Sequence, residues 1–208
     1  MPAVNRAAGR TVKIMDNGAD RERVRRLVKS ARGGDEESFG ELVKMYHERV
    51  YGLAYGLVHS ADDAQEIAQQ TWVKVWNKLR DFKGDAEFFT WVYRVASNAS
   101  LDHLRHKTRL REDSLVDGVE PQEAFGRERA PSENPRPDRE AERAEIRRVF
   151  EQALGSLSAE HRLALTLREV DGLSYDEIAK VMKCRKGTVM SRIFYARRAV
   201  QEKLKELQ

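Results

Sequence analysis

The sequence predicts an all-α protein made of two small helical domains joined by a flexible acidic linker. Apolar residues recur at helical spacing in two separate stretches, and no stretch alternates with the period of a β-strand. Four of the five prolines lie between or at the edge of those stretches. The 208 residues are 35% charged and 40% hydrophobic, which is typical of small domains with a large surface relative to their core.

The first domain is predicted over residues 20–106, after a disordered arm at 1–19 that shows no periodicity. Its four helices are expected at about 20–32, 35–59, 61–79 and 86–106. Gly33-Gly34 ends the basic first helix, and Asp35 can cap the second. Acidic residues in the first turn of the third helix suit the positive end of its dipole.

A linker is predicted over 107–138, where no apolar period is sustained. It holds or borders Pro121, Pro131, Pro135 and Pro137. From Glu112 to Glu145 eleven acidic residues face five arginines, a net charge of −6, although the whole chain carries +4. The positive charge is therefore concentrated in the two domains.

The second domain is predicted over 139–208 with four further helices. The first spans about 139–154, and Ser158 caps the next. Ser174 and Glu177 form an S-x-x-E capping box that opens a short helix. A basic turn then leads into a final long helix, which is the order of a helix-turn-helix.

This helix-turn-helix is the first candidate site. From 185 to 205 seven basic residues face one acid, a local net charge of +6 that suits DNA phosphates. The second helix would enter the major groove of duplex DNA. The candidate DNA-binding residues are Arg185, Lys186, Thr188, Met190, Ser191, Arg192, Tyr195, Arg197 and Arg198. The alternative is a charged helical hairpin on the surface of a bundle. The capping box, the basic turn and the local net charge together favour DNA binding.

The second candidate site mixes aromatic rings with cations in the fourth helix and the loop before it. Rings can stack on bases while cations meet phosphates, which suits single-stranded DNA. The candidates are Phe82, Lys83, Trp91, Tyr93, Arg94, Asn98, Asp102 and Arg105. Trp91 at helical spacing with Val92 and Val95 fits a core position equally well. The residues alone leave the two interpretations even.

The third candidate is the polar face of the third helix. It carries Asp62, Asp63, Glu66, Gln69 and Gln70. On composition alone this is a solvated helix face.

Signatures of an enzyme are missing, so neither catalysis nor a cofactor or metal is expected. The sequence has no glycine-rich phosphate loop, H-E-x-x-H motif or Cys/His cluster of metal spacing. The single cysteine, Cys184, allows no intrachain disulfide and fits a reducing compartment. No signal peptide and no run of ~20 apolar residues is present, which predicts a cytoplasmic protein without direct membrane insertion.

Two passages resemble the sigma-70 family, in particular its extracytoplasmic-function (group IV, sigma-E-like) members. DDAQEIAQQTWVKVWNKLRDFKGDAEFFTWVYRVASNASLDHLRHKTR (62–109) is similar to conserved region 2, and LSAEHRLALTLREVDGLSYDEIAKVMKCRKGTVMSRIFYARRAVQEKL (157–204) is similar to region 4. The order of the two, across a linker and without region 3, carries the resemblance. It implies an alternative sigma factor that directs core RNA polymerase to promoters.

The resemblance also assigns roles and partners. The third-helix face would dock on the β′ coiled coil of core polymerase, and the second domain on the β flap. The loop 81–87 and the fourth helix would open the −10 element as single strands, with Asn98 lining the pocket of a flipped base. The helix-turn-helix would read the duplex −35 element. An anti-sigma factor is expected to control the chain.

Departures from the family pattern bear on specificity. Arg185 replaces a proline common after the turn cysteine, and Gln70 replaces an acid. Met190 and Tyr195 stand where close relatives place arginines. Since both can contact a thymine methyl, a −35 sequence different from the commonest sigma-E-like one is expected. The alternative function is a two-domain helix-turn-helix regulator acting without core polymerase.

Overall fold

The computed structural model describes residues 18–84, 86–116, 149 and 152–206. These residues form helices joined by turns, and no strand occurs among them, which confirms the predicted all-α class. The predicted arm, apart from residues 18 and 19, and the linker beyond Val116 lie outside the described residues.

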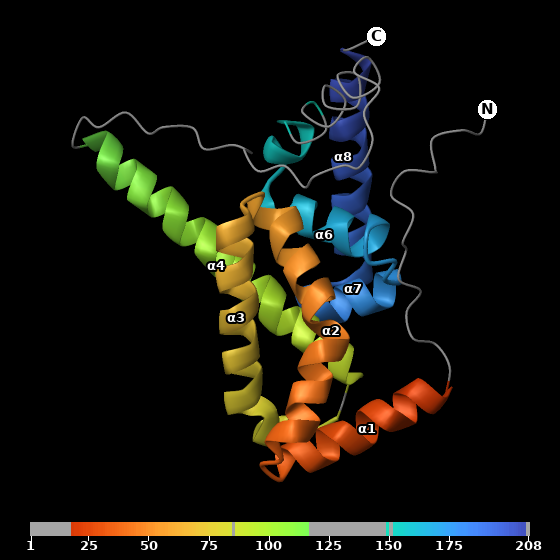
Figure 1. Cartoon of the computed structure of the whole chain (residues 1–208). Helices are drawn as coiled ribbons and strands as arrows, with labels where there is room; N and C mark the ends of the chain where they lie inside the picture. Colours follow the sequence, from red (N-terminus) through yellow and green to blue (C-terminus); the bar gives the residue numbers. More distant parts are fainter. Residues whose placement is uncertain (1–17, 85, 117–148, 150–151, 207–208) are drawn as a thin grey trace, which may run out of the picture.

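The first domain is a bundle in which two long helices lie side by side and a third crosses them (Figure 1). Its elements are α1 (Gly18–Arg32), α2 (Glu36–Val58), α3 (Ala61–Lys78), the 3₁₀ turn η1 (Leu79–Asp81) and α4 (Phe88–Val116). The Asp35 side chain caps α2 by accepting from the Glu37 N–H at 3.3 Å, as predicted. Ser60 caps α3 in the same way. Leu42, Val50 and Val92 are fully buried between the helices.

Helix α4 is longer than the sequence pattern predicts. The expected end near residue 106 is wrong, because the helix runs to Val116 into the predicted linker. Its last turns extend away from the bundle (Figure 1). Residues 108–110 are exposed there, so no buried apolar face marks the extension in the sequence.

The second domain contains α6 (Ala159–Glu169), α7 (Tyr175–Met182) and α8 (Lys186–Lys205), preceded by a helical segment at 152–155. The capping box is confirmed: the Ser174 N–H donates to Glu177 Oε2 at 2.8 Å, and the Glu177 N–H donates to Ser174 Oγ at 3.3 Å. Most of the predicted helix at 139–154 lies outside the described residues.

The two domains pack against each other, which the sequence pattern does not reveal. Helix α6 lies against α2, and α7 lies against α4 (Figure 1). One apolar cluster runs through both domains, from Val24 in α1 to Ile193 in α8. Gly56 lies directly against α6, because a Cβ built on it would lie 3.0 Å from Thr166 Cγ2, so a larger residue there would require the Thr166 side chain to shift. We call this surface, which includes Gly56, Leu57, Tyr93, Arg162, Thr166 and Asp171, the interdomain contact.

Candidate nucleic-acid interface

Helix α8 presents one buried face and one exposed face. Val189, Ile193 and Ala196 are buried against the rest of the second domain. On the other side Met190 is 51% exposed and Tyr195 58%. Phe194 is 60% exposed on the same side, although the sequence interpretation did not select it. The sequence does contain a signal for this exposure. Phe194 directly follows Ile193, which points inward, and consecutive residues of a helix point about 100° apart.

The charges of the helix-turn-helix are partly compensated within the chain. Lys186 Nζ lies 2.9 Å from Asp176 Oδ2, Arg197 Nε donates to Glu169 Oε1 at 3.0 Å, and Arg198 Nε donates to Glu202 Oε1 at 2.8 Å. These side chains are exposed, and exposed ion pairs exchange easily for phosphate because each is worth little. Arg185 and Arg192 have no acidic partner within the part of the chain that the structure describes.

The polar part of this site has local roles as well. Arg185 stands at the N-cap of α8, where free backbone N–H groups favour an anion. Ser191 Oγ donates to the Thr188 carbonyl at 3.0 Å, which leaves its lone pairs available. Arg192 and Thr188 are half-buried beside the exposed residues. The predicted residues of this site thus lie on or beside one exposed face.

The second candidate site divides into a buried and an exposed part. Trp91 is buried and Tyr93 is fully buried, whereas Asn98 and Lys83 are exposed. Half-buried Phe82 joins the two parts, since its ring centroid lies 4.9 Å from that of Trp91. The remaining polar members lie along α4: Arg94 is half-buried, and exposed Arg105 Nη1 donates to Asp102 Oδ1 at 3.2 Å.

Tyr93 is held in the interdomain contact by a charged cluster. Its hydroxyl donates to Asp171 Oδ1 at 2.7 Å, and Asp171 comes from the turn after α6. The Arg49 guanidinium lies 4.1 Å from the Phe89 ring centroid and 5.6 Å from that of Tyr93. Burial raises the pKa of Asp171 to about 6, although the Tyr93 hydroxyl and the Arg49 charge oppose that rise. Burial also raises the pKa of Tyr93.

Arg162 forms the second polar link between the domains. Its guanidinium donates to the carbonyls of Leu154, Gly155 and Leu157 in its own domain. Across the interdomain contact, Nη1 donates to the Leu57 carbonyl at the end of α2 at 2.6 Å. Burial lowers the pKa of Arg162. Burial and the Arg162 charge lower the pKa of nearby His59 to about 4, which keeps this imidazole neutral.

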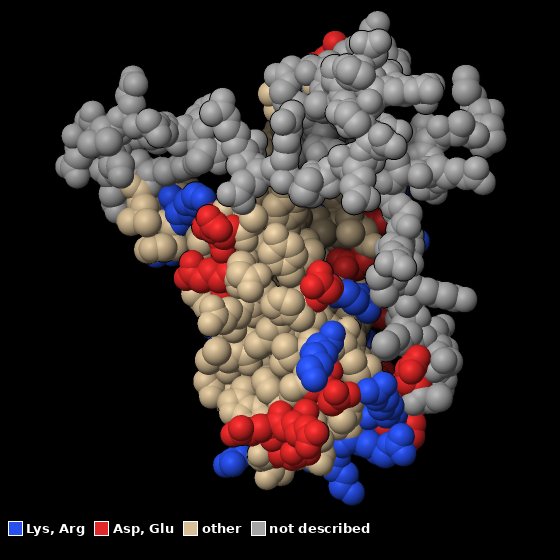
Figure 2. Space-filling view, viewed as in Figure 1, with Lys and Arg blue, Asp and Glu red and all other residues tan. Residues whose placement is uncertain are grey.

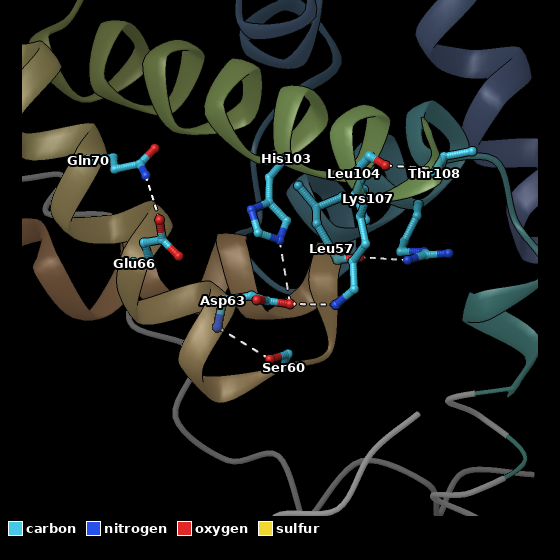
Figure 3. Close-up of polar contacts among 10 residues, drawn as sticks. Leu57, Ser60, Asp63, Glu66, Gln70, His103, Leu104, Lys107 and Thr108 are labelled. Atoms are coloured by element: carbon cyan, nitrogen blue, oxygen red, sulfur yellow. Dashed lines mark hydrogen bonds and ion pairs between the residues drawn. The ribbon is translucent and has the colours of Figure 1, made fainter. Parts of the chain in front are cut away.

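The predicted polymerase-binding face begins with an ion cluster between α3 and α4 (Figure 3). Asp63 Oδ2 accepts from Lys107 Nζ at 2.8 Å and lies 3.5 Å from His103 Nε2. Burial alone would raise the pKa of Asp63, but Lys107, His103 and Ser60 hold it below its usual range. One turn later Gln70 Nε2 donates to Glu66 Oε1 at 2.8 Å. Asp63 therefore braces α4 against α3.

Beside this face runs a groove between α2 and α3. Asp62, Glu66, Gln69 and Gln70 are exposed, and Gln69 also lines the groove. Its apolar lining consists of Phe39, Val43, Trp72, Val73 and Trp76. Val73 is 56% exposed, and Figure 2 shows uncharged atoms across the middle of this face. The sequence interpretation missed the groove, because Val73 is a lone apolar residue on a polar helix face.

The described residues offer neither a helix that could span a bilayer nor a cluster of metal-ligating side chains. No described helix combines the length and apolar character that crossing a bilayer requires. No group of three or more His, Cys, Asp and Glu side chains among the described residues is arranged to hold a metal ion. Cys184 is a free, half-buried cysteine in the turn before α8.

Comparison with known proteins matches both halves of the chain. The family model of Sigma-70 region 2 matches residues 42–110, and that of Sigma-70 region 4 matches residues 147–200. The RNA polymerase sigma-H factor of Pseudomonas aeruginosa is 40% identical over 89% of this chain and 96% of its own length. The ECF RNA polymerase sigma-E factor of Escherichia coli K12 is 38% identical over 87% of this chain and 94% of its own length.

Solved structures agree with this match. The sigma factor RpoE of Bartonella quintana, in complex with the anti-sigma factor NepR, aligns with a TM-score of 0.65 and 27% identity over 81% of this chain and 98% of that chain. CnrH, in complex with the cytosolic domain of CnrY, aligns with a TM-score of 0.63 and 25% identity over 90% of this chain and 99% of that chain. The chain therefore belongs to the sigma-70 family, among the extracytoplasmic-function sigma factors that direct core RNA polymerase to promoters.

Proposed function

We propose that this sigma factor contacts core polymerase through the α2–α3 face and reads a promoter with two separate surfaces. The groove between α2 and α3, with Gln69 at its edge, would receive the β′ coiled coil, because its apolar side chains are open to solvent. The second domain would meet the β flap. The chain works by binding and supplies no catalytic group, and its place is the cytoplasm, where the polymerase is.

The exposed face of α8 is the surface proposed for the −35 element. Arg185 and Arg192 would meet phosphate or base edges, while Met190, Phe194 and Tyr195 offer apolar contact. The apolar side chains favour thymine methyls in the major groove, which supports a −35 element unlike the commonest sigma-E-like one. Selection of bound promoter fragments from a random pool by the holoenzyme checks this, and recovery of the common element would refute it.

The exposed part of the α4 site is proposed for the melted −10 element. The Asn98 carboxamide is free in solvent and can pair with the edge of an extruded base. Lys83 and Arg105 would meet the phosphates of the same strand. Energy for opening would come from base capture, since the chain has no nucleotide-hydrolysis motif in its sequence.

The two surfaces cannot serve both elements while the domains stay packed. Elements about 25 base pairs apart lie ~85 Å apart along B-DNA at 3.4 Å per pair. A compact chain of this length has a radius of gyration of about 17 Å, hence a diameter of roughly 45 Å. We infer that polymerase binding separates the domains at the interdomain contact and that the linker spans the gap.

An anti-sigma factor is proposed as the regulator. The structural relative RpoE is bound to one, NepR, and CnrH is bound to the cytosolic domain of CnrY. Here such a partner would stabilise an arrangement in which the α2–α3 groove or the exposed face of α8 is covered.

Run-off transcription with purified core polymerase tests this function. The chain should start defined transcripts from cognate promoters, and Asn98→Ala should reduce them while binding of core is retained. Asn77→Ala, which removes an exposed asparagine at the end of α3, is the matched control and should change neither. Tight promoter binding by the chain without polymerase would instead support the two-domain regulator.

A further inference from the structure

The start of α6 carries a variant of the capping box that opens α7. In α7 the Ser174 hydroxyl accepts from the Glu177 N–H, and the Glu177 carboxylate returns to the Ser174 N–H. In α6 the Ser158 hydroxyl accepts from the His161 N–H at 3.4 Å. The side chain of His161 also turns back to the cap, since its Nδ1 lies 2.6 Å from Ser158 Oγ. An imidazole thus stands where a carboxylate would complete the box.

The same imidazole contacts the exposed face of α8. The ring centroids of His161 and Tyr195 lie 6.5 Å apart, with the ring planes at 77°. This is the edge-to-face arrangement that aromatic pairs favour at separations of about 4.5–7 Å. His161 is half-buried, and its hydrogen bond to Ser158 restrains the ring. A ring anchored on α6 therefore supports a ring on α8.

Tyr195 needs support from outside its own helix. Its side chain is 58% exposed, so burial alone does not fix its rotamer. The residues three and four positions away on α8 bring no ring to it: Ser191, Arg192, Arg198 and Ala199. Phe194, the residue before it, lies 5.5 Å from it between ring centroids but is itself 60% exposed. Of these two neighbouring rings, His161 is the one that the cap of α6 holds in place.

We propose that His161 is a positioning residue for promoter recognition, which holds the Tyr195 ring in the orientation that reads the −35 element. The edge-to-face contact favours the Tyr195 rotamer that keeps the two rings together. A side chain restricted before binding loses less conformational freedom when it meets a thymine methyl. The inference rests on the proposed function, in which the exposed face of α8 reads that element.

Selection from promoter fragments randomised in the −35 element tests the pair, with each variant assembled into holoenzyme. The enrichment of each base gives the preference at each position. Tyr195→Ala should abolish the preference at the position that Tyr195 reads. His161→Ala should weaken the preference at that same position by about fivefold and leave the other positions unchanged. His161→Phe keeps a ring against Tyr195 and should retain most of the preference.

A double variant separates positioning from a direct contact with DNA. In the Tyr195→Ala background, His161→Ala should change the base preference no further, because its effect passes through the Tyr195 ring. Glu160→Ala is the matched control, since it truncates the neighbouring half-buried residue of α6. It should leave the base preference at every position as in wild type.

The outcomes distinguish the inference from the proposed function. An unchanged preference in His161→Ala, or a loss spread evenly over all positions, would overturn the positioning role. The same local change in Glu160→Ala, or a further loss in the Tyr195→Ala background, would also overturn it. In all these cases Tyr195→Ala still alters the −35 preference, so the proposed function stands. If Tyr195→Ala, Met190→Ala and Phe194→Ala all leave the preference unchanged, the proposed function of α8 fails as well.

Discussion

The interdomain contact and the groove between α1 and the segment before α4, which Lys29 and Phe82 both line, contain the same kinds of residue in opposite settings. In the interdomain contact, half-buried Arg49 lies over the Phe89 and Tyr93 rings, and half-buried Asp171 accepts from the Tyr93 hydroxyl. In the groove, Lys29 and Phe82 both belong to the lining, and Lys29 remains exposed. A buried cation or acid must find its partner within the chain, whereas an exposed one keeps its charge for a ligand.

The difference explains why arginine and aromatic residues alone do not identify a DNA surface. Tyr93 is an aromatic residue with arginines nearby, which is the composition expected of a DNA surface. Its hydroxyl is nevertheless hydrogen-bonded to Asp171, and its ring is fully buried. In the interdomain contact, loss of one polar partner leaves the others without a replacement from water.

The largest effect is expected at Arg162. Arg162→Met removes the donors to four backbone carbonyls, including that of Leu57 across the interdomain contact. The free energy of unfolding should fall by about 3 kcal/mol or more, because several buried acceptors lose their partner together. Urea unfolding measures it. Arg168→Met on the same helix removes the donor to a single carbonyl, that of Leu173, so an equal loss there would contradict this account.

A pH-dependent effect is expected at Asp171. Because its folded pKa is raised to about 6, the protonated form is favoured on folding, and this contribution is lost as pH rises from about 4 through 6. Asp171→Asn should stabilise the chain at pH 8 by roughly 2 kcal/mol, since the amide stays neutral and still accepts from Tyr93.

The comparison between two pH values isolates this group. At pH 4 the advantage of Asp171→Asn should nearly vanish, since the aspartate is then largely protonated in the folded chain. The contribution of neutral His59 to the free energy of unfolding changes in the opposite direction, since it is lost as pH falls from 6.5 toward the folded pKa of about 4. His59 is present in both proteins, so this contribution cancels in the comparison. The same difference at pH 4 and pH 8 would show that the Asp171 carboxylate is not the cause.

The smallest effect is expected for Tyr93→Phe. The ring stays, but Asp171 Oδ1 loses its donor, which should cost about 1 kcal/mol in urea unfolding. Run-off transcription should not fall, because the hydroxyl serves the closed arrangement and not the DNA. A loss of transcripts with retained stability would place that hydroxyl at the promoter instead.

The sequence predicted the elements better than their arrangement. Helical period and caps such as Asp35 and Ser174 are local, so they located α2 and α7 well. The interdomain contact depends on whether an apolar face of α6 packs within its own domain or against the other domain. The helical period of α6 is the same in both cases. The exposed face of α8 was predictable because Ile193 fixes the inward face. The burial of Tyr93 was not, because a core ring and a stacking ring have the same spacing.

A reversible cross-link between the domains tests most directly whether they must separate to work. A Cβ built on Gly56 lies 3.9 Å from Thr166 Cβ, within the ~3.5–4.5 Å that a disulfide requires. Gly56→Cys/Thr166→Cys, made with Cys184→Ser, should give no run-off transcript with core polymerase when oxidised and regain it on reduction. Equal transcription by the oxidised and the reduced protein would contradict the account, because the closed chain would then suffice for both promoter elements.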